Sequence, residues 1–276
     1  MLRRAVAAAG ITAAAGLGWS LFEAQWVELK EVEVPLGRLP EELDGLTIVH
    51  LSDFHLGTVS FNGRTLDRAV RWAAESPCDL VVLTGDLLSR QRGDVHLRRA
   101  ISALRPRHGV YAVLGNHDVA VTRDPFSTVT DASGLAAEGA VLLDDDSVRL
   151  EVAGRTVQIA GGHPNIDWKK QRLERLADPD ADLRILLFHY PDIVHYLPPG
   201  AFDLVLAGHL HGGQICVPTP RGKVRLEHLR APHWEGVHPT PAGTLHVSRG
   251  LGTSFVPFRF LARPEATRLV LRIAGH

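Results

Sequence analysis

The stretch TIVHLSDFH, residues 47–55, is the part of this sequence that decides the fold. Its first six residues form a short apolar run, and the polar residues Asp53 and His55 follow at once. Short apolar runs of this kind, bounded by turn residues, are typical of strands that are buried on both faces. The same pattern, with polar residues directly after it, recurs in LVVLT (80–84), VYAVL (110–114), RILLF (184–188) and FDLVLA (202–207). The chain is therefore expected to contain a sheet covered on both sides.

The segments between and after these runs predict helices and further strands. Gly63 to Glu75 carries apolar residues at helical spacing, and a second helix is expected from Asp94 to Leu104, with Asp94 as its cap. Alternating apolar residues from Val148 to Ala160 surround Gly154 and predict a hairpin. Late strands are expected at Leu245–Ser248 and Ala266–Ile273. This alternation of strands and helices predicts the α/β class.

The composition fits a folded enzyme-sized domain and excludes several classes of protein. Of the 276 residues, 45% are apolar and 22% are charged, which excludes a disordered or coiled-coil chain. The formal net charge is −1, so no nucleic-acid partner is expected. Two cysteines, Cys78 and Cys216, are too few for a disulfide framework or a multi-thiolate zinc site, and we interpret both as buried inert thiols. The 15 histidines are the unusual feature.

Chemistry-bearing residues follow the strands. Because the carboxyl ends of strands in an open α/β sheet border one crevice, the polar loops are expected to meet there. Carboxylates, an amide oxygen and imidazoles suit Mn, Fe or Zn better than Mg or Ca. In an extended loop Asp53 and His55 would point to the same side, as would His209 and His211. Asp86 is the candidate to bridge two ions about 3.5–4 Å apart. The motifs are Asp53-x-His55, Gly85-Asp86, Gly115-Asn116-His117-Asp118, His189 and Gly208-His209-x-His211.

In this order, and over about Ile48 to Ile215, the motifs resemble those of the calcineurin-like metallophosphoesterase family. Gln214 and the segment SRGLG (248–252) resemble the membrane-associated bacterial subgroup of that family. The resemblance implies a four-layer α/β/β/α sandwich of two mixed sheets. The segment GGHP (161–164) departs from the acidic stretch that relatives often have after a glycine, which concerns substrate contacts.

The resemblance also implies a site with two divalent or trivalent metal ions (Mn, Fe or Zn) and a catalytic pair. Its first ion would be held by Asp53, His55, Asp86 and His211, and its second by Asp86, Asn116, His189 and His209. His117 would stay off the metals and protonate the leaving oxygen, with Asp118 orienting it. With seven groups on metal, His117 is also the ionisable group that remains to donate a proton near pH 7.

The expected activity is hydrolysis of a phosphodiester or pyrophosphate bond by a metal-bound hydroxide. The subgroup resemblance implies a phosphorylated small molecule or lipid as substrate, such as a phospholipid or a nucleotide-lipid. Two alternatives stay open: a phosphomonoesterase with the same metal centre, and a non-catalytic metal-binding interaction module.

The N-terminal segment, residues 1–26, is expected to be a membrane anchor or signal segment ahead of a catalytic domain at 27–276. Ala5 to Phe22 carries no charge and follows Arg3 and Arg4, which favour a cytoplasmic N-terminus. This predicts a single-pass protein of the cell membrane with an extracytoplasmic catalytic domain. A cleaved secretory peptide and a helix buried in the domain are the alternatives.

Other polar residues have structural interpretations beside functional ones. His189 follows an apolar run and could be a core histidine, and His50 is expected to pack inside a strand. The run Arg90–Arg107 holds six arginines and is either a solvated face or a surface for anionic headgroups or a phosphorylated substrate. Arg249 either contacts phosphate or fixes its loop. Surface or structural roles are expected for His163, His195, His228, His233, His238 and His246.

Overall fold

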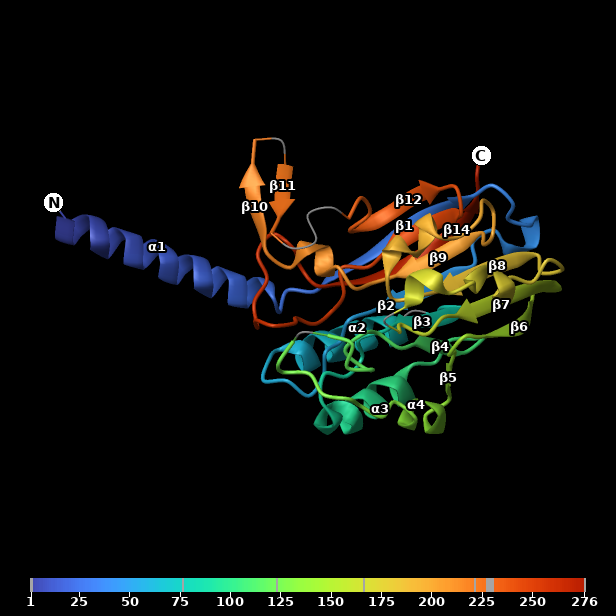
Figure 1. The fold of residues 1–276 in the computed structure, drawn as a ribbon, viewed down its shortest axis with the longest axis horizontal. Coiled ribbons are helices and arrows are strands. Elements are labelled where there is room, and N and C mark those ends of the chain that lie inside the picture. Colours follow the sequence, from blue (N-terminus) through green and yellow to red (C-terminus); the bar gives the residue numbers. More distant parts are fainter. Residues whose placement is uncertain are drawn as a thin grey trace.

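Two six-stranded mixed sheets pack face to face in the computed structural model, which describes residues 2–75, 77–122, 124–165, 167–220, 222–226 and 231–275 (Figure 1). The first sheet has the strand order β1-β14-β2-β3-β4-β5 and the second β12-β13-β9-β8-β7-β6. The strands of the first are β1 Glu28–Leu36, β2 Thr47–Leu51, β3 Leu80–Thr84, β4 Val110–Val113, β5 Ala140–Leu142 and β14 Glu265–Ile273. Those of the second are β6 Asp146–Val152, β7 Arg155–Gly161, β8 Leu183–Leu187, β9 Leu204–Ala207, β12 Gly236–Thr240 and β13 Gly243–Val247.

Parallel pairing in the middle of each sheet brings strand ends to one edge. β2, β3 and β4 are parallel neighbours, with Leu51 opposite Leu83 and Thr84 opposite Val113. β8 and β9 are parallel neighbours in the second sheet, with Leu187 opposite Leu206. The five strands predicted from the apolar runs are therefore confirmed, with ends that shift by at most two residues.

Apolar side chains from both sheets form the central core. Ile48, Val82 and Val113 from the first sheet pack with Ile185 and Leu206 from the second, and all are fully buried. At about 25 cal/mol per Å² of apolar surface, this shared layer holds the two sheets together. Because the sheets cannot separate without exposing it, the loops at their common edge are held in a fixed relation.

Helices cover the outer face of the first sheet. They are α2 Asn62–Glu75, α3 Asp94–Ala103 and α4 Gly134–Ala137. Leu66, Ala69 and Ala73 form the buried stripe of α2, as its helical spacing predicts. The outer face of the second sheet packs against short 3₁₀ helices, among them Pro191–His195, so the outermost layer there is thinner than the resemblance implies.

Some local predictions are corrected by the structure. Asp94 is the first residue of α3 and not its cap: Gly93 precedes it and no side chain caps the helix. The hairpin at Val148–Ala160 is confirmed as β6 and β7, which turn at Ala153 and Gly154. The strands β1, β5 and β12 and the hairpin of β10 Cys216–Thr219 and β11 Gly222–Arg225 were not predicted. In β1, charged residues interrupt the apolar ones, so this edge strand lacks the continuous apolar run from which the central strands were predicted.

The N-terminal helix α1, Leu2–Glu23, projects away from the domain (Figure 1). Its last turns are bound to the loop before β14: the Arg259 N–H donates to Ser20 O at 3.1 Å, and the Ala262 N–H to Glu23 Oε1 at 2.7 Å. Trp19, Phe22 and Trp26 contact one another here and stay substantially exposed. Over the described part of the chain, no helix combines the length and apolar character needed to cross a membrane.

A buried ion network fixes β14 under the loops at the sheet edge. Glu265 is 0% exposed, and its carboxylate accepts hydrogen bonds from Lys30 Nζ at 2.8 Å and Arg249 Nε at 2.6 Å. Burial alone would raise the pKa of Glu265, but Arg249 and Lys30 outweigh it and hold the pKa at about 2. The interpretation of Arg249 as the residue that fixes its loop is thereby confirmed.

Replacing Glu265 by Gln is expected to destabilise the fold and flatten its acid dependence. A depressed carboxyl pKa stabilises the native state above the unfolded value of about 4.5, and that contribution disappears as pH falls toward 2. A displacement of this size corresponds to about 3 kcal/mol at pH 7. Urea unfolding at pH 7 and pH 3 tests this, with Glu33→Gln, at an exposed ion pair, as control. Equal losses in the two variants would contradict the expectation.

Candidate metal centre

The predicted ligands come from loops of both sheets. Asp53 and His55 follow β2, Asp86 follows β3, and Asn116 and His117 follow β4. His189 follows β8, and His209 and His211 follow β9. All except the half-buried His209 are buried. The centre therefore lies where the carboxyl ends of the two sheets meet, as the motif order predicts.

Left-handed backbone conformations aim these side chains. The φ angles are 54° at Asp53, 47° at His55, 53° at Asp86, 74° at His209 and 49° at His211. Non-glycine residues rarely adopt such values, and each costs about 1–3 kcal/mol that the surrounding structure must supply. The prediction that Asp53 and His55 sit in an extended loop is therefore wrong. Their side chains converge because the chain turns sharply at each residue.

Glycines beside the ligands allow the loops to approach closely. A Cβ at Gly115 would lie 2.1 Å from Asp86 Oδ1, and one at Gly208 would lie 2.4 Å from Asp53 Oδ2. Any side chain at either position would displace a predicted ligand. This explains why both motifs place glycine before the ligating residue.

The first predicted ligand group is compact. Asp53, His55 and His211 each offer a ligand atom within 4.8 Å of the others. His55 Nε2 lies 3.0 Å from His211 Nε2, and His211 Nε2 lies 3.5 Å from Asp53 Oδ1. Two imidazole nitrogens turned toward each other beside a carboxylate suit a shared cation.

The second predicted group gathers on the other side of Asp86. Asp86, His189 and His209 each offer a ligand atom within 4.8 Å of the others. His189 Nε2 lies 3.0 Å from Asn116 Oδ1 and 3.2 Å from His209 Nδ1. The amide and the two imidazoles thus converge on one point, as the resemblance implies.

Asp86 lies between the two groups. Its Oδ2 is 3.6 Å from His55 Nε2 and 3.2 Å from His189 Nε2. Its Oδ1 accepts the backbone N–H of His117 at 2.8 Å, which fixes the plane of the carboxylate. One oxygen faces both groups, which is the geometry that a bridging ligand requires.

His117 stands at the rim of the first group. Its Nε2 lies 3.9 Å from Asp86 Oδ2, and its Nδ1 lies 2.6 Å from Ser127 Oγ and 3.7 Å from Asp124 Oδ2. His55, Asp86 and His117 also form a third group that could hold an ion. The geometry thus allows His117 either on a metal or beside it, and the resemblance favours the second.

Asp118 does not orient His117, and that prediction is wrong. Its carboxylate accepts backbone N–H groups of Gly115 at 2.8 Å, Leu88 at 2.8 Å and Leu87 at 3.2 Å. It therefore ties the loop after β4 to the loop after β3. Burial, and then Asp86, raise the pKa of Asp118 to about 7.

Burial and mutual charge shift the other pKa values strongly. Burial raises the pKa of Asp53 to about 6, and burial together with His117 lowers that of His55 to about 3. Burial would raise the pKa of Asp86, but His189 and His117 hold it well below its usual range. Burial would lower the pKa of His189, but Asp86 and Asp53 raise it to about 9.

The residues of the two predicted ligand groups fit metal ions. Buried carboxylates and facing imidazole nitrogens are costly without a cation to compensate them. The donor set of carboxylate, amide and imidazole groups is that of Mn, Fe or Zn sites. Metal ions would bind through these clusters and stabilise a centre that the fold has already assembled.

Removing metal is expected to make stability depend on pH above neutrality. In the metal-free protein, the raised pKa of His189 contributes stability that is fully present below pH 6.5 and is lost as pH rises through about 9. Chelator-treated protein should therefore unfold at lower urea concentration at pH 9 than at pH 6.5. The metal-loaded protein should lose far less, because bound metal keeps His189 deprotonated throughout. Equal slopes for both forms would contradict this.

Further residues position the ligands, and sequence motifs did not identify them. Ser89 Oγ lies 3.1 Å from His55 Nδ1, and the Thr84 carbonyl lies 2.8 Å from His189 Nδ1. Arg259 is 0% exposed and reaches His211 Nδ1 at 3.2 Å, and burial together with Arg249 lowers its pKa to about 9. Partners of this kind fix the orientation of ligating imidazoles. Thr84 and Ser89 flank the Gly85-Asp86 motif, whereas Arg259 comes from a distant loop that carries no motif.

The other histidines that the structure describes lie away from the predicted ligand groups. His50 and His246 are fully buried with Nδ1 atoms 2.8 Å apart, which confirms structural roles for both. His163 pairs with Asp144 on the surface. His195 and His233 stack with ring centroids 5.8 Å apart. His228 lies outside the described residues. Cys78 and Cys216 are free and buried, as predicted, and burial raises the pKa of both thiols.

Comparison with known proteins agrees with this geometry. Residues 46–213 match the model of the calcineurin-like phosphoesterase family. The chain is 33% identical to the uncharacterized metallophosphoesterase YkoQ of Bacillus subtilis, over 80% of this chain and 82% of that protein. It is 31% identical to a transmembrane protein with a metallophosphoesterase domain from Danio rerio, over 99% of this chain and 63% of that protein. It is 28% identical to the UDP-2,3-diacylglucosamine pyrophosphatase LpxG of Chlamydia muridarum, over 83% of this chain and 85% of that protein.

The matched segment contains every residue of the two predicted ligand groups and His117. The chain therefore belongs to the calcineurin-like phosphoesterase family and is a metal-binding hydrolase that acts on phosphoric ester bonds.

Proposed function

We propose that this protein uses two metal ions to hydrolyse a phosphodiester or pyrophosphate bond in a phospholipid or nucleotide-lipid. The observation that carries the proposal is the position of Asp86. Its Oδ2 lies within 3.6 Å of His55 Nε2 and 3.2 Å of His189 Nε2, so one oxygen serves two ligand groups. Two ions that share Asp86 would be close enough to act on one phosphoryl group.

The residues around the centre have distinct parts in this reaction. When bound, the two ions supply Lewis-acid activation of water and neutralise charge on the phosphoryl oxygens. Asp53, His55 and His211 would hold one ion, and Asn116, His189 and His209 would hold the other, with Asp86 available to both. His117 Nε2 faces this centre and donates a proton to the leaving oxygen. Ser127 and Asp124 contact the opposite nitrogen and keep the ring in that orientation.

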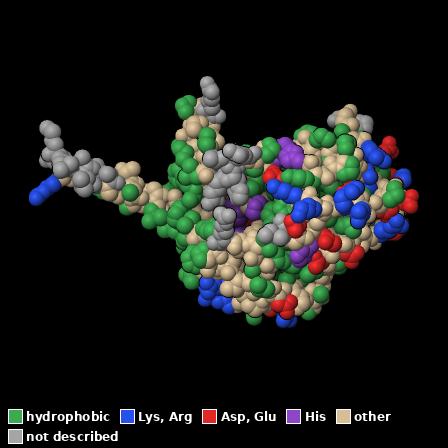
Figure 2. Space-filling model, viewed as in Figure 1, with side chains coloured by type: hydrophobic (Ala, Val, Ile, Leu, Met, Phe, Trp, Pro, Cys, Tyr) green, Lys and Arg blue, Asp and Glu red, His purple; other side chains and the backbone are tan. Residues whose placement is uncertain are grey.

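The choice of substrate class has two supports. LpxG, which is similar over most of this chain, is by name a pyrophosphatase of a diacylated nucleotide sugar. Hydrophobic side chains also gather at the end of the molecule where α1 joins the domain, whereas charged side chains dominate the opposite end (Figure 2). An enzyme of lipid phosphates needs such an apolar face near its active centre.

We further propose that the enzyme is exported and that α1 attaches it to the surface of the cell membrane, with the catalytic domain on the extracytoplasmic side. Trp19, Phe22 and Trp26 are exposed aromatic side chains of the kind found at membrane interfaces. A reporter fused to the C-terminus tests this location. A reporter enzyme that is active only outside the cytoplasm should be active in the fusion. Reporter activity confined to the cytoplasm would contradict it.

Hydrolysis by the 276-residue chain tests the central proposal. The Mn²⁺-loaded protein is expected to cleave bis(p-nitrophenyl) phosphate faster than p-nitrophenyl phosphate, because a diester is the proposed substrate. Metal analysis of the same sample should give two ions per chain. Faster monoester cleavage would favour a phosphomonoesterase, and stoichiometric metal without hydrolysis would favour a binding module.

A further inference from the structure

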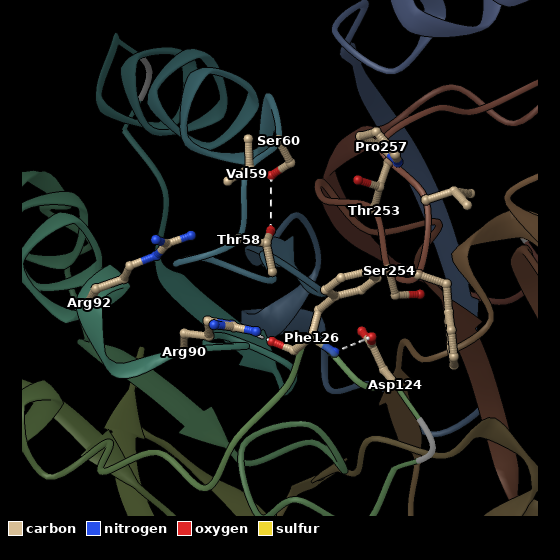
Figure 3. A pocket seen from close by; sticks show the side chains of 12 residues that line it. Thr58, Val59, Ser60, Arg90, Arg92, Asp124, Phe126, Thr253, Ser254 and Pro257 are labelled. Atoms are coloured by element: carbon tan, nitrogen blue, oxygen red, sulfur yellow. Dashed lines mark hydrogen bonds between the residues drawn. The ribbon is translucent and has the colours of Figure 1, made fainter.

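A pocket of about 370 Å³ opens beside the metal centre on the side of His117 (Figure 3). That volume lies within the range of about 300–1,000 Å³ typical of small-molecule sites. Asp124 is a wall residue, and its Oδ2 lies 3.7 Å from His117 Nδ1. Thr58, another wall residue, donates its hydroxyl to the carbonyl of His55 at 3.2 Å. The pocket thus shares its inner wall with the residues that hold His117 and His55.

The lining combines apolar and cationic side chains. Its apolar members are Val59, Phe126, Phe255, Val256 and Pro257. Arg90 and Arg92 stand on one wall, Thr253, Ser254 and Pro257 on the opposite wall, and Phe126 lies between them (Figure 3). This pairing of a hydrophobic surface with two guanidinium groups matches an amphiphile that carries an anionic group.

Arg90 and Arg92 differ from Arg98 and Arg107 of the Arg90–Arg107 run in what they bind. Arg98 pairs with Glu138 and Arg107 with Asp79. Arg90 and Arg92 instead donate their Nε–H groups to the backbone carbonyls of Phe126 and Gly57. Among the described residues neither forms an ion pair with a carboxylate, so their terminal NH₂ groups are oriented but uncompensated. Such groups suit a phosphoryl oxygen.

Asp124 does not cancel this positive charge toward the pocket. Its side chain is buried, and its oxygens accept the Phe126 N–H at 2.9 Å and the Ser127 hydroxyl at 3.4 Å. The same carboxylate faces His117 Nδ1. The negative charge of Asp124 therefore faces His117 and not Arg90 or Arg92.

Phe255 is held in the pocket against its conformational preference. Its φ is 58°, a left-handed value that is unusual for a bulky residue, and its side chain is 46% exposed. Gln214 holds the backbone on both sides of it, donating to Ser254 O at 2.9 Å and Val256 O at 3.3 Å and accepting the Ser254 N–H at 3.0 Å. Gln214 follows His211 in the same loop, after Gly212 and Gly213. A strained, exposed aromatic ring held by the metal-binding loop indicates a binding role.

We propose that this pocket binds the leaving group of the substrate, as an aliphatic chain along Phe126, Phe255 and Val59 with an anionic group at Arg90 and Arg92. The proposal rests on the hydrolase function proposed above. The pocket adjoins the proton donor, because Asp124 lines it and lies 3.7 Å from His117 Nδ1. In this arrangement the lipid portion of the substrate is the leaving group, whose chain the apolar lining matches, and it lies next to the loop that binds α1.

Binding of alkylphosphonates tests the pocket separately from hydrolysis, because their C–P bond is not a substrate for this reaction. Calorimetry on the metal-loaded 276-residue chain, below micelle concentrations, should show affinity rising from butyl- to dodecylphosphonate by up to about 4-fold per buried methylene. Affinity independent of chain length would overturn the proposal.

Matched variants locate the bound chain and its anionic group. Arg92→Gln should weaken dodecylphosphonate binding about 10-fold, whereas Arg105→Gln, at an arginine of the same run that bonds backbone carbonyls, should not. Val59→Ser should weaken it about 3-fold, whereas Val95→Ser should not, although the two valines are 89% and 78% exposed. Because α1 is unchanged in all four variants, adsorption to that helix would affect them equally. Equal effects in pocket and control variants would overturn the proposal.

Phe255→Gly separates binding from folding. Glycine adopts a φ of 58° without strain, so the melting temperature should not fall, while dodecylphosphonate binding should weaken about 10-fold. Unchanged binding in this variant would overturn the proposal. If the pattern of binding holds but no phosphoester is cleaved, the pocket stands and the hydrolase function fails. If diesters are cleaved without any preference for an alkyl chain on the leaving group, the pocket proposal fails alone.

Discussion

The Asp86→Asn variant is expected to lose metal and activity together, with hydrolysis of bis(p-nitrophenyl) phosphate falling about 10³-fold or more. The reason is that Oδ2 of Asp86 faces His55 on one side and His189 on the other, so its negative charge serves both ligand groups. An amide oxygen keeps the shape but removes the charge that holds two cations together. Metal analysis after exhaustive dialysis, alongside initial rates, measures both effects.

Asp203→Asn is the matched control for this change. Asp203 is another largely buried aspartate, but its oxygens bind Arg184 in an ion pair before β9, at the opposite end of that strand from His209 and His211. It should lose stability and retain metal and turnover per folded molecule. Full metal occupancy in Asp86→Asn would show that Asp86 does not bridge, and the two-metal proposal would be wrong.

Replacing His117 by Ala is expected to keep metal bound and lower turnover about 10²- to 10⁴-fold, the usual contribution of a general acid. The loss should grow as the leaving group becomes more basic, because an alkoxide needs a proton more than a nitrophenolate does. Rates for the p-nitrophenyl and phenyl diesters of one alkyl phosphate, which differ only in the basicity of the leaving group, measure this together with metal content.

His96→Ala supplies the control, since His96 is a surface histidine paired with Asp67. Loss of metal in His117→Ala would assign His117 to the third ligand group, with His55 and Asp86, and would end its role as proton donor. Equal losses for good and poor leaving groups would also contradict general acid catalysis. Ser127→Ala should show a smaller version of the same leaving-group dependence, because its hydroxyl only orients the ring.

The contacts of His117 mark where sequence reasoning reached its limit. The sequence predicted the neighbouring Asp118 as the partner of His117, but the carboxylate of Asp118 accepts three backbone N–H groups instead. The contacts come from Ser127 and Asp124 at Nδ1 and from Thr122 at Nε2, in a loop that has no recognisable pattern. The path of the backbone decides which side chain contacts His117, and the residue types in a loop say little about that path.

The central strands, the order of the motifs and the candidate ligand residues could be predicted from the sequence, because buried strands need apolar runs and metal sites need particular donor atoms. Asp53, His55 and Asp86 were identifiable from residue type and position after a strand. Only the tertiary structure decided how they converge: through left-handed turns at five ligand positions and glycines that admit neighbouring loops. It also decided which arginines form no ion pair with a carboxylate among the described residues, and that Gln214 holds the backbone on both sides of the exposed Phe255. These features depend on pairs of residues far apart in the chain, and such pairs leave no local periodicity from which they could be predicted.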